Sequence, residues 1–181
     1  MPQYSYSLPS LGSDSIRLLG LMPNEDENAP IHCRLHHYPL QKLNNGTHLY
    51  EALSYVWGGS DTPQSVFIDN YDLPVTVNLY KALLRLRDRT FERILWVDSI
   101  CINQADEQEK EHQIQSMAKI YGQANRVIVY LGDAADDSDQ ALEGIRVAAE
   151  TESTSSLQSE EGPKAMLKLL ERPWFRRIWV S

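Results

Sequence analysis

Short apolar runs separated by polar turns recur along the chain, a pattern typical of strands. The runs predict strands at residues 15–21, 31–38, 49–56, 65–69, 94–100 and 126–131. A turn-rich stretch joins the first two, which predicts an antiparallel hairpin within residues 15–40. The last two are apolar over most of their length, as expected of strands in a mostly parallel sheet with both faces covered.

Apolar residues spaced three and four positions apart predict helices between and after these strands. The helix after the fourth strand has one face formed by Leu79, Ala82, Leu83 and Leu86. A longer helix is predicted at residues 106–121, with a stop at Gly122 that suits a helix C-terminus. Its expected core side consists of Ile114, Met117, Ala118 and Tyr121. Helix and strands must bury these faces against each other, which predicts one common core of Trp96, Ile114, Met117, Val127 and Val129.

The C-terminal part of the chain predicts two more helices and a loop. Residues 136–150 are amphipathic, and residues 163–170 form a helix that begins at a proline. Between them, residues 151–162 are polar and rich in Ser, Thr and Glu, which indicates a flexible loop. Residues 176–181 have the character of a strand that is beginning.

Strands that alternate with helices of this length predict an α/β fold. We expect a three-layer domain, with a mainly parallel sheet flanked by helices and an N-terminal β-hairpin. The length of 181 residues favours a single domain over residues 1–181. In such folds ligands bind outside the carboxyl ends of the strands.

Charge and cysteine content limit the classes of binding partner and the cellular compartment that we expect for this protein. The net charge of −8 argues against nucleic acid or an anionic membrane as the main partner. No apolar run approaches the roughly 20 residues of a membrane span. Two cysteines and no recognisable signal peptide favour a reducing compartment, the cytoplasm.

Polar residues collect where the strand at residues 94–100 ends. Asp98 lies within the apolar run, so its carboxylate needs donors if it is buried. It either orients a ligand hydroxyl or accepts backbone N–H groups of the next loop. Asn103 and Gln104 suit recognition of ribose or amide groups, but Asn is equally a common loop and cap residue.

Glu109 is the acid of greatest interest, and two interpretations stay open. On a helical projection it lies beside Gln113 and Ile120, at the boundary between the core-facing and solvent-facing sides of the helix. A partly desolvated carboxylate there suits general acid–base work or stabilisation of a developing cation. The spacing Asp106-x-x-Glu109 also matches a capping box, in which Glu109 only binds a backbone N–H.

The stretch "SYVWGGSD" joins a strand to a Gly-Gly turn. Gly58 permits a close approach of the backbone to a ligand phosphate, and Tyr55 or Trp57 offers a face for stacking a base. The same residues also fit an ordinary strand-to-turn junction with core aromatics. Neither the dinucleotide-fold fingerprint nor a P-loop occurs in the sequence.

Two further groups of residues are interpreted as structural. Cys101 with His112 would make a nucleophile and base, but no third orienting group is evident, and a buried cysteine is favoured. The stretch "IHCRLHH" offers metal ligands without a second ligand pair, so no metal site is predicted.

Three blocks of this sequence resemble the HET (heterokaryon incompatibility) domain of filamentous fungi. They are "YEALSYVWGG", "LWVDSICINQADEQEKEHQIQSMAKIYGQANRVIVYLG" and "RPWFRRIWV", in the order and at the separations usual for that family. They make residues 49–180 the signature-bearing α/β core of one HET-like domain. The resemblance implies a role in self/non-self recognition and programmed cell death.

HET domains are distantly similar to TIR domains, which implies a TIR- or flavodoxin-like fold. Some TIR domains cleave NAD+, and Glu109 matches the motif position that this similarity makes catalytic. Cleavage of the nicotinamide–ribose bond passes through an oxocarbenium-like state that a carboxylate stabilises.

Two hypotheses for the activity are compatible with these residues. In the first the chain hydrolyses NAD+ or a related nucleotide as its substrate, without a cofactor, and Glu109 is catalytic. The residues assigned to the substrate are Ser54, Tyr55, Trp57, Gly58, Asp98, Cys101, Asn103, Gln104 and Gln113. In the second the chain is a death-signalling module without chemistry, and a large exposed apolar patch on a helix or edge strand would favour it. Under both hypotheses we expect a homo-oligomer in the active state.

Overall fold

The computed structural model describes residues 2–6, 14–40, 48–59, 63–151 and 161–177, and the chain divides into two compact units, Met1–Tyr130 and Leu131–Ser181. The strands of the first unit are β1 (Ser15–Leu21), β2 (His32–Pro39), β3 (His48–Tyr55), β4 (Gln64–Ile68), β5 (Tyr71–Val75), β6 (Arg93–Trp96) and β7 (Ala124–Tyr130). Its helices are α1 (Val77–Leu86), α2 (Asp98–Cys101) and α3 (Glu107–Gln123). The organisation as a single domain stays a prediction.

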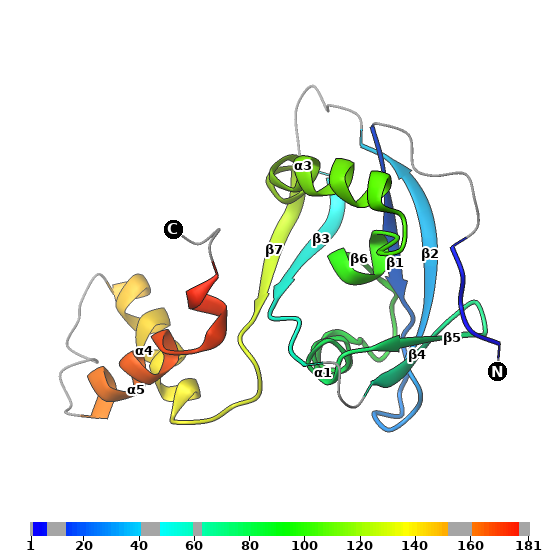
Figure 1. Cartoon of the computed structure of the whole chain (residues 1–181). Coiled ribbons are helices and arrows are strands. Elements are labelled where there is room, and N and C mark those ends of the chain that lie inside the picture. Colours follow the sequence, from blue (N-terminus) through cyan, green and yellow to red (C-terminus); the bar gives the residue numbers. More distant parts are fainter. Residues whose placement is uncertain (1, 7–13, 41–47, 60–62, 152–160, 178–181) are drawn as a thin grey trace. The chain divides into compact units, whose positions relative to one another are not determined.

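The strands form one mixed sheet in the order β5-β4-β2-β1-β6-β3-β7 (Figure 1). β1 pairs antiparallel with β2 from Ser15↔Pro39 to Leu21↔Cys33, which confirms the predicted hairpin. β3 is parallel to β6 and β7, whereas β1 is antiparallel to β6 and β4 is antiparallel to β5. The prediction of a mainly parallel sheet is therefore wrong. Short connections join β1 to β2 and β4 to β5, and such connections join antiparallel strands only.

β5 was not predicted, and its turn explains how it forms. Asp69 and Asn70 connect β4 to β5 with φ of 48° and 70°. Two consecutive residues with positive φ are typical of a tight hairpin turn, and Asp and Asn tolerate that conformation. Pro74 lies in β5, which is an edge strand, where a residue without an N–H is tolerated.

The strand predicted at residues 94–100 is wrong in its second half. β6 ends at Trp96, and Asp98–Cys101 forms the short helix α2. The Asp98 carboxylate accepts the N–H of Ser99 at 2.8 Å, a local bond that competes with extension of the strand. Ile100 and Cys101 are apolar because α2 buries them.

β7 is an edge strand, and the prediction that both faces of residues 126–131 are covered is wrong because side chains on one face of it are exposed. Val127 and Val129 are 47% and 41% exposed, whereas Ile128 and Tyr130 pack against the core. The predicted common core of Trp96, Ile114, Met117, Val127 and Val129 is wrong for the two valines and for Ile114. Trp96 is buried, and Met117 is partly buried against the core.

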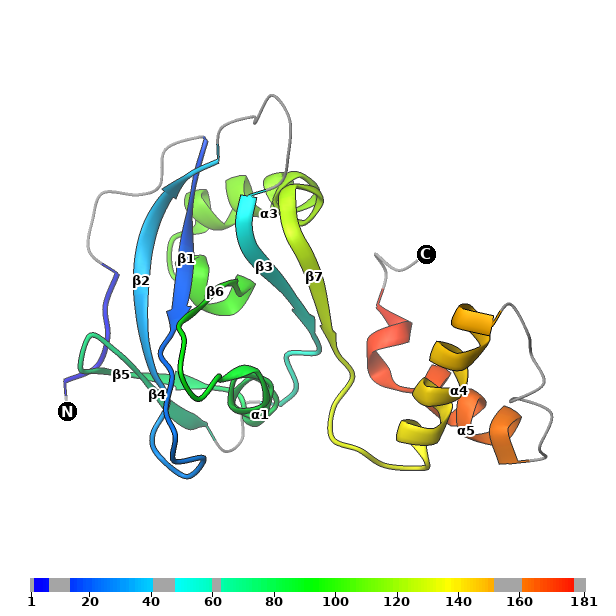
Figure 2. The same ribbon diagram turned by 180° about the vertical axis from the view of Figure 1, so that it is seen from behind.

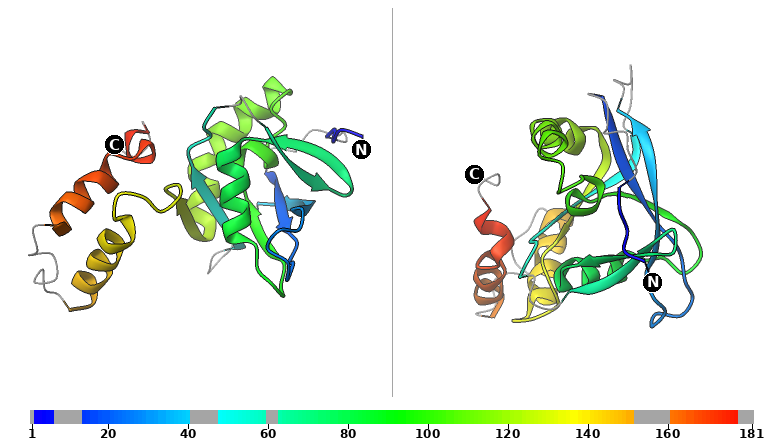
Figure 3. Two further views of the ribbon diagram at one scale, coloured as in Figure 1. Left: turned by 90° about the horizontal axis from the view of Figure 1, so that it is seen from below. Right: turned by 45° about the vertical axis from the view of Figure 1, so that its right-hand side comes forward.

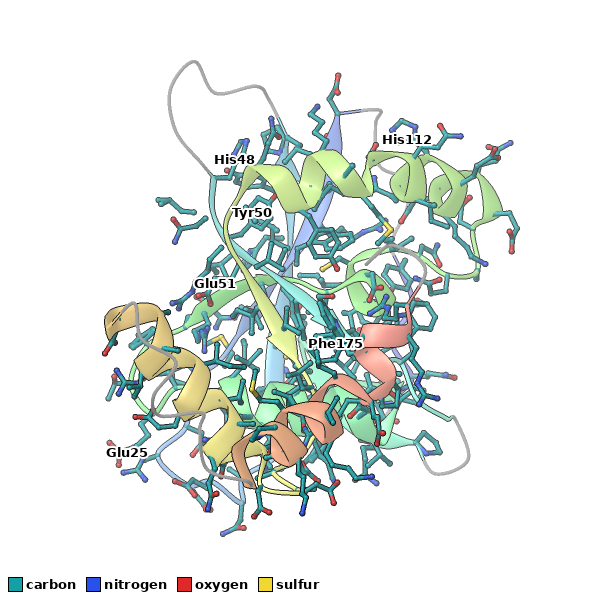
Figure 4. All side chains as sticks on the ribbon, turned by 90° about the vertical axis from the view of Figure 1, so that its left-hand side faces the viewer. Glu25, His48, Tyr50, Glu51, His112 and Phe175 are labelled. Atoms are coloured by element: carbon teal, nitrogen blue, oxygen red, sulfur yellow. The ribbon has the colours of Figure 1, made fainter. Side chains whose placement is uncertain are left out.

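α2 and α3 lie on one face of the sheet, as Figures 1 and 2 show from opposite sides. The hydroxyl of Tyr50 on β3, labelled in Figure 4, donates to the Ile120 carbonyl of α3 at 2.6 Å. Trp96 meets Tyr121 edge-to-face at 5.4 Å between ring centroids. These aromatic contacts fix α3 against the middle of the sheet.

α1 lies against β3 and β4 (Figure 3) and has the predicted buried face. Leu79, Ala82 and Leu83 are buried, and Thr76 caps the helix by accepting the N–H of Leu79. The periodicity was sufficient here because the inward residues of α1 are apolar and its outward residues are mostly polar.

The predicted core side of α3 is confirmed for Met117 and Tyr121, which pack against the core, and is wrong for Ile114 and Ala118. Glu109, Gln113 and Ile120 are its buried residues, whereas Ile114 is 52% exposed and Ala118 is exposed. Two of the buried residues are polar, so the spacing of apolar residues does not reveal that they face the core. The helix also continues past Gly122, to Gln123.

The second unit contains α4 (Ser138–Thr151), α5 (Glu161–Leu170) and a 3-10 helix, η2 (Pro173–Arg176). Ala141, Ala165 and Leu169 form its core. The two helices agree with the predicted ones, but residue 176, where a strand was expected to begin, ends η2. Residues 178–181 of that strand and most of the predicted flexible loop lie outside the described residues. Within the part of the chain that is described, no helix is long and apolar enough to cross a membrane.

Candidate functional site

The carboxyl ends of β3 and β6 bring the first group of predicted site residues together. The Trp57 indole N–H donates to Asp98 Oδ2 at 3.0 Å, and the Tyr55 hydroxyl lies 2.6 Å from Ser99 Oγ. β3 and β6 are parallel, so their carboxyl ends lie at the same edge of the sheet. Tyr55 is the last residue of β3, and the other three residues follow within three positions of a strand end. We call Tyr55, Trp57, Asp98 and Ser99 the strand-end cluster.

Asp98 is the buried anchor of this cluster, with 6% of its surface exposed. Its two carboxylate oxygens accept from the Trp57 indole and from the Ser99 N–H. Its backbone carbonyl accepts from the Gln104 amide at 3.1 Å. The donors that a buried carboxylate requires are therefore supplied by the protein itself.

The two aromatic side chains of the strand-end cluster differ in what they present to solvent. Tyr55 is 1% exposed, whereas Trp57 is 43% exposed with its indole nitrogen held by Asp98. Gly58 comes next with φ of +77°, a left-handed conformation that favours glycine. Ser54, also predicted to be in the site, is buried. Only Trp57 offers an exposed ring for stacking in this part of the described structure.

Glu109 lies in a second group, on the side of α3 that faces β1. Both of its oxygens bind Arg17, at 2.5 Å to Nη1 and 3.0 Å to Nη2. Its Oε1 also accepts the N–H of Asn103 at 2.7 Å. The side chain of Arg17 is 11% exposed and that of Glu109 is 1% exposed, so the two form a buried bidentate ion pair.

The capping box proposed for Asp106 and Glu109 is half formed. Asp106 is the N-cap and accepts the N–H groups of Gln108 and Glu109 at 3.1 and 3.0 Å. Glu109 does not complete the box, because the Asp106 N–H donates to the Asn103 carbonyl and Glu109 turns to the Asn103 N–H instead. The catalytic role of Glu109 stays a prediction.

Arg17 was missed by the sequence analysis, although it holds the second group together. Its Nη1 also donates to the Cys101 carbonyl at 3.2 Å, and its guanidinium carbon lies 5.0 Å from the centre of the Tyr6 ring. The one signal in the sequence is a charged residue inside the apolar strand "SIRLLGL". Its partner Glu109 is 92 positions away, so no local pattern pairs the two.

Cys101 and Gln113 complete the second group. Gln113 is 2% exposed and donates to the Ser15 carbonyl of β1 at 2.9 Å. Cys101 is 1% exposed, and its sulfur accepts the N–H of Val97 at 3.3 Å. Burial raises the pKa of the Cys101 thiol to about 12, so the thiol is protonated at neutral pH. The expectation of a buried cysteine is confirmed.

We expect both cysteines to resist alkylation in the folded chain. Cys33 is also buried, and burial raises the pKa of its thiol to about 12. The reactive thiolate is therefore scarce at pH 8, and iodoacetamide should modify the folded chain at least about 100-fold more slowly than the urea-unfolded chain. Mass spectrometry over time measures both rates. Equal rates would contradict the buried positions of these thiols.

A third carboxylate, that of the partly buried Glu51 of β3, is also held by arginines. Its Oε2 binds Arg93 Nη2 at 2.5 Å, and its Oε1 binds Arg126 Nε (Figure 4). Its side chain is 13% exposed. Among the described side chains, no three His, Cys, Asp or Glu residues are grouped so as to hold a metal ion.

Comparisons with known proteins agree with the sequence blocks that contain β3, β6 and α3. Residues 50–181 match the family described as Heterokaryon incompatibility protein (HET). The chain is 29% identical to Heterokaryon incompatibility protein 6, OR allele, of Neurospora crassa, over 98% of this chain and 33% of that protein. It thus spans about a third of the length of this curated relative. No solved structure is significantly similar. Because the family match covers well over half of its length, the chain belongs to the heterokaryon incompatibility (HET) protein family.

Proposed function

We propose that this chain is a cell-death effector module in fungal self/non-self recognition, and that it acts by association with other protein chains and not by hydrolysis. Family membership and the name of the Neurospora relative support the role in heterokaryon incompatibility. The chain covers a third of that relative, so the role of the whole relative comes to this chain only as part of the proposal.

The contacts and burial of the Glu109 carboxylate are the observation that favours association over hydrolysis. A carboxylate that stabilises a developing cation must face the reacting carbon of the substrate. Both oxygens of Glu109 face Arg17, one of them also binds the Asn103 N–H, and 1% of the side chain is exposed. The positive charge of Arg17 already compensates this carboxylate.

The exposed side of β7 supports association. Val127 and Val129 leave two branched apolar side chains on an edge strand. Unpaired backbone groups and apolar side chains on an edge strand make it a template for another chain. Homo-oligomerisation through such an edge is the form of association that we propose.

Hydrolysis of NAD+ at the nicotinamide–ribose bond is the second candidate function. The strand-end cluster favours it, because Trp57 offers an exposed ring whose orientation Asp98 fixes, at the sheet edge where α/β folds bind ligands. For hydrolysis, the Glu109 carboxylate would have to break its hydrogen bonds with Arg17 and face the substrate. No cofactor is needed, since nicotinamide is itself the leaving group.

Replacing Glu109 by Gln distinguishes the two candidate functions. Gln keeps the shape and can still accept the Asn103 N–H, but it removes the charge. Under the association proposal, fungal cells that express Glu109→Gln from an inducible promoter die as often as cells that express the parent chain. Purified parent chain at high concentration should then release no nicotinamide from NAD+ above a protein-free blank.

Glu107→Gln is the matched control, because Glu107 lies in the same first turn of α3 with 84% of its side chain exposed. Melting temperatures of both variants establish that they are folded. If the parent and Glu107→Gln release nicotinamide and folded Glu109→Gln does not, NAD+ hydrolysis replaces association as the function. If the parent chain kills no cells, it is not an effector by itself.

A further inference from the structure

Residues 2–6 cross the first unit outside the main strands and carry Tyr6 to the ion pair of Arg17 and Glu109. The segment joins β5 through one isolated bridge between Gln3 and Asp72. The Tyr4 N–H donates to the Asp72 carbonyl at 2.8 Å, and the Asp72 N–H donates to the Pro2 carbonyl at 3.0 Å. We call residues 2–6 the N-terminal strap.

Tyr6 adds a cation–π contact to the hydrogen bonds that Arg17 makes with Glu109 and the Cys101 carbonyl. A guanidinium donates hydrogen bonds along its edges and offers two flat faces for stacking. The edges of Arg17 bind Glu109 and the Cys101 carbonyl, whereas the Tyr6 ring lies 5.0 Å from its carbon. The Tyr6 hydroxyl donates to the Ile100 carbonyl at 2.7 Å. The ring is thus held by a cation–π contact with Arg17 and by one hydrogen-bond acceptor.

We propose that Tyr6 is a built-in plug. It fills a slot beside Arg17 that takes a planar aromatic ring carrying one hydrogen-bond donor, and the N-terminal strap closes this slot over Glu109. The contacts of Tyr6 are those that a bound ligand of this class would make: a cation–π contact with Arg17 and a hydrogen bond donated to the Ile100 carbonyl.

The strap is built to be displaced. Outside Tyr6, its attachments to the residues that the structure describes include the two backbone hydrogen bonds with Asp72 and the partial packing of Tyr4. Gln3 and Ser5 are exposed. Segments with few buried contacts open more readily than the sheet beneath them. This inference goes beyond the proposed function, since it concerns access to Glu109 whether or not Glu109 is catalytic.

Carboxyl labelling of the whole chain tests the plug. A water-soluble carbodiimide with glycine ethyl ester modifies accessible carboxylates, and mass spectrometry locates the label. Replacing Tyr6 by Gly should raise labelling of Glu109 at least about tenfold over the parent, because opening of the strap is no longer needed. Adding p-cresol, which copies the tyrosine side chain, should return the labelling toward that of the parent, and toluene should protect less.

Glu51 is the internal control, because it is also mostly buried and bound by arginines. Its labelling should not change in Tyr6→Gly. If labelling of Glu51 also rises, the Tyr6→Gly variant is unfolded, and the Tyr6→Phe variant tests the plug instead. Tyr6→Phe keeps the ring but loses the hydrogen bond to the Ile100 carbonyl, so labelling of Glu109 should rise about fivefold. Unchanged Glu109 labelling in a folded Tyr6→Gly variant, or in Tyr6→Phe, would overturn the plug. Equal protection by p-cresol and toluene would overturn the donor requirement. Neither result depends on whether the chain kills cells or cleaves NAD+.

Discussion

Replacing Arg17 by Met should lower the free energy of unfolding of the first unit by about 3–5 kcal/mol. Met keeps much of the length and apolar stem of arginine but removes the guanidinium. Glu109, with 1% of its side chain exposed, then loses both bonds to the guanidinium and keeps the one from the Asn103 N–H. The Cys101 carbonyl also loses a donor, and the Tyr6 ring loses its cation. Urea denaturation followed by circular dichroism measures the change.

A second substitution separates the ion pair from the packing around it. Replacing both partners by apolar residues, Arg17→Met with Glu109→Leu, removes both buried charges and should recover most of the lost stability. The control is Arg89→Met, because Arg89 and its partner Glu27 are 71% and 75% exposed and the pair should contribute at most about 1 kcal/mol. A double variant as unstable as Arg17→Met alone would show that the loss comes from packing and not from an uncompensated charge.

Ile120→Ala should lower the free energy of unfolding by about 2–5 kcal/mol, since Ile120 is 0% exposed and its deletion leaves a cavity. Ile114→Ala removes the same atoms from the same helix. Because Ile114 is 52% exposed, the loss there should stay within about 0.5 kcal/mol. The pair of variants therefore controls for helix propensity and residue type, and denaturant midpoints compare them directly.

The outcome of this pair decides which face of α3 meets the sheet. Equal losses, or a larger loss for Ile114→Ala, would mean that the apolar spacing identified the core side correctly and that Glu109 and Gln113 lie toward solvent. The Arg17–Glu109 pair would then not exist, and both the plug and the preference for association would lose their basis.

The polar residues of "LWVDSICINQ" are explained by hydrogen bonds within the fold. Asp98 holds Trp57 and begins α2, and the Gln104 amide closes α2 by donating to the Asp98 and Ile102 carbonyls. Asn103 offers its N–H to Glu109, and its side chain accepts the N–H of Ala105 at 3.2 Å. These bonds connect the strand-end cluster to the Glu109 group through α2.

Sequence patterns were sufficient to predict the elements whose formation depends on neighbours in the chain. The β1–β2 hairpin results from two alternating runs joined by a turn, and the buried face of α1 results from apolar residues at helical spacing. The family could also be identified from the blocks around β3, α2 and α3, which the comparison confirmed.

Contacts between distant segments set the direction of the strands, the exposed side of β7 and the burial of Glu109 and Gln113 on α3. Each of these depends on which distant segment supplies a partner. Glu109 and Gln113 face inward because β1 offers Arg17 and the Ser15 carbonyl, nearly a hundred positions earlier in the chain. A polar residue is buried when its partner compensates the lost hydration, and the spacing of residues within one helix carries no information about that partner.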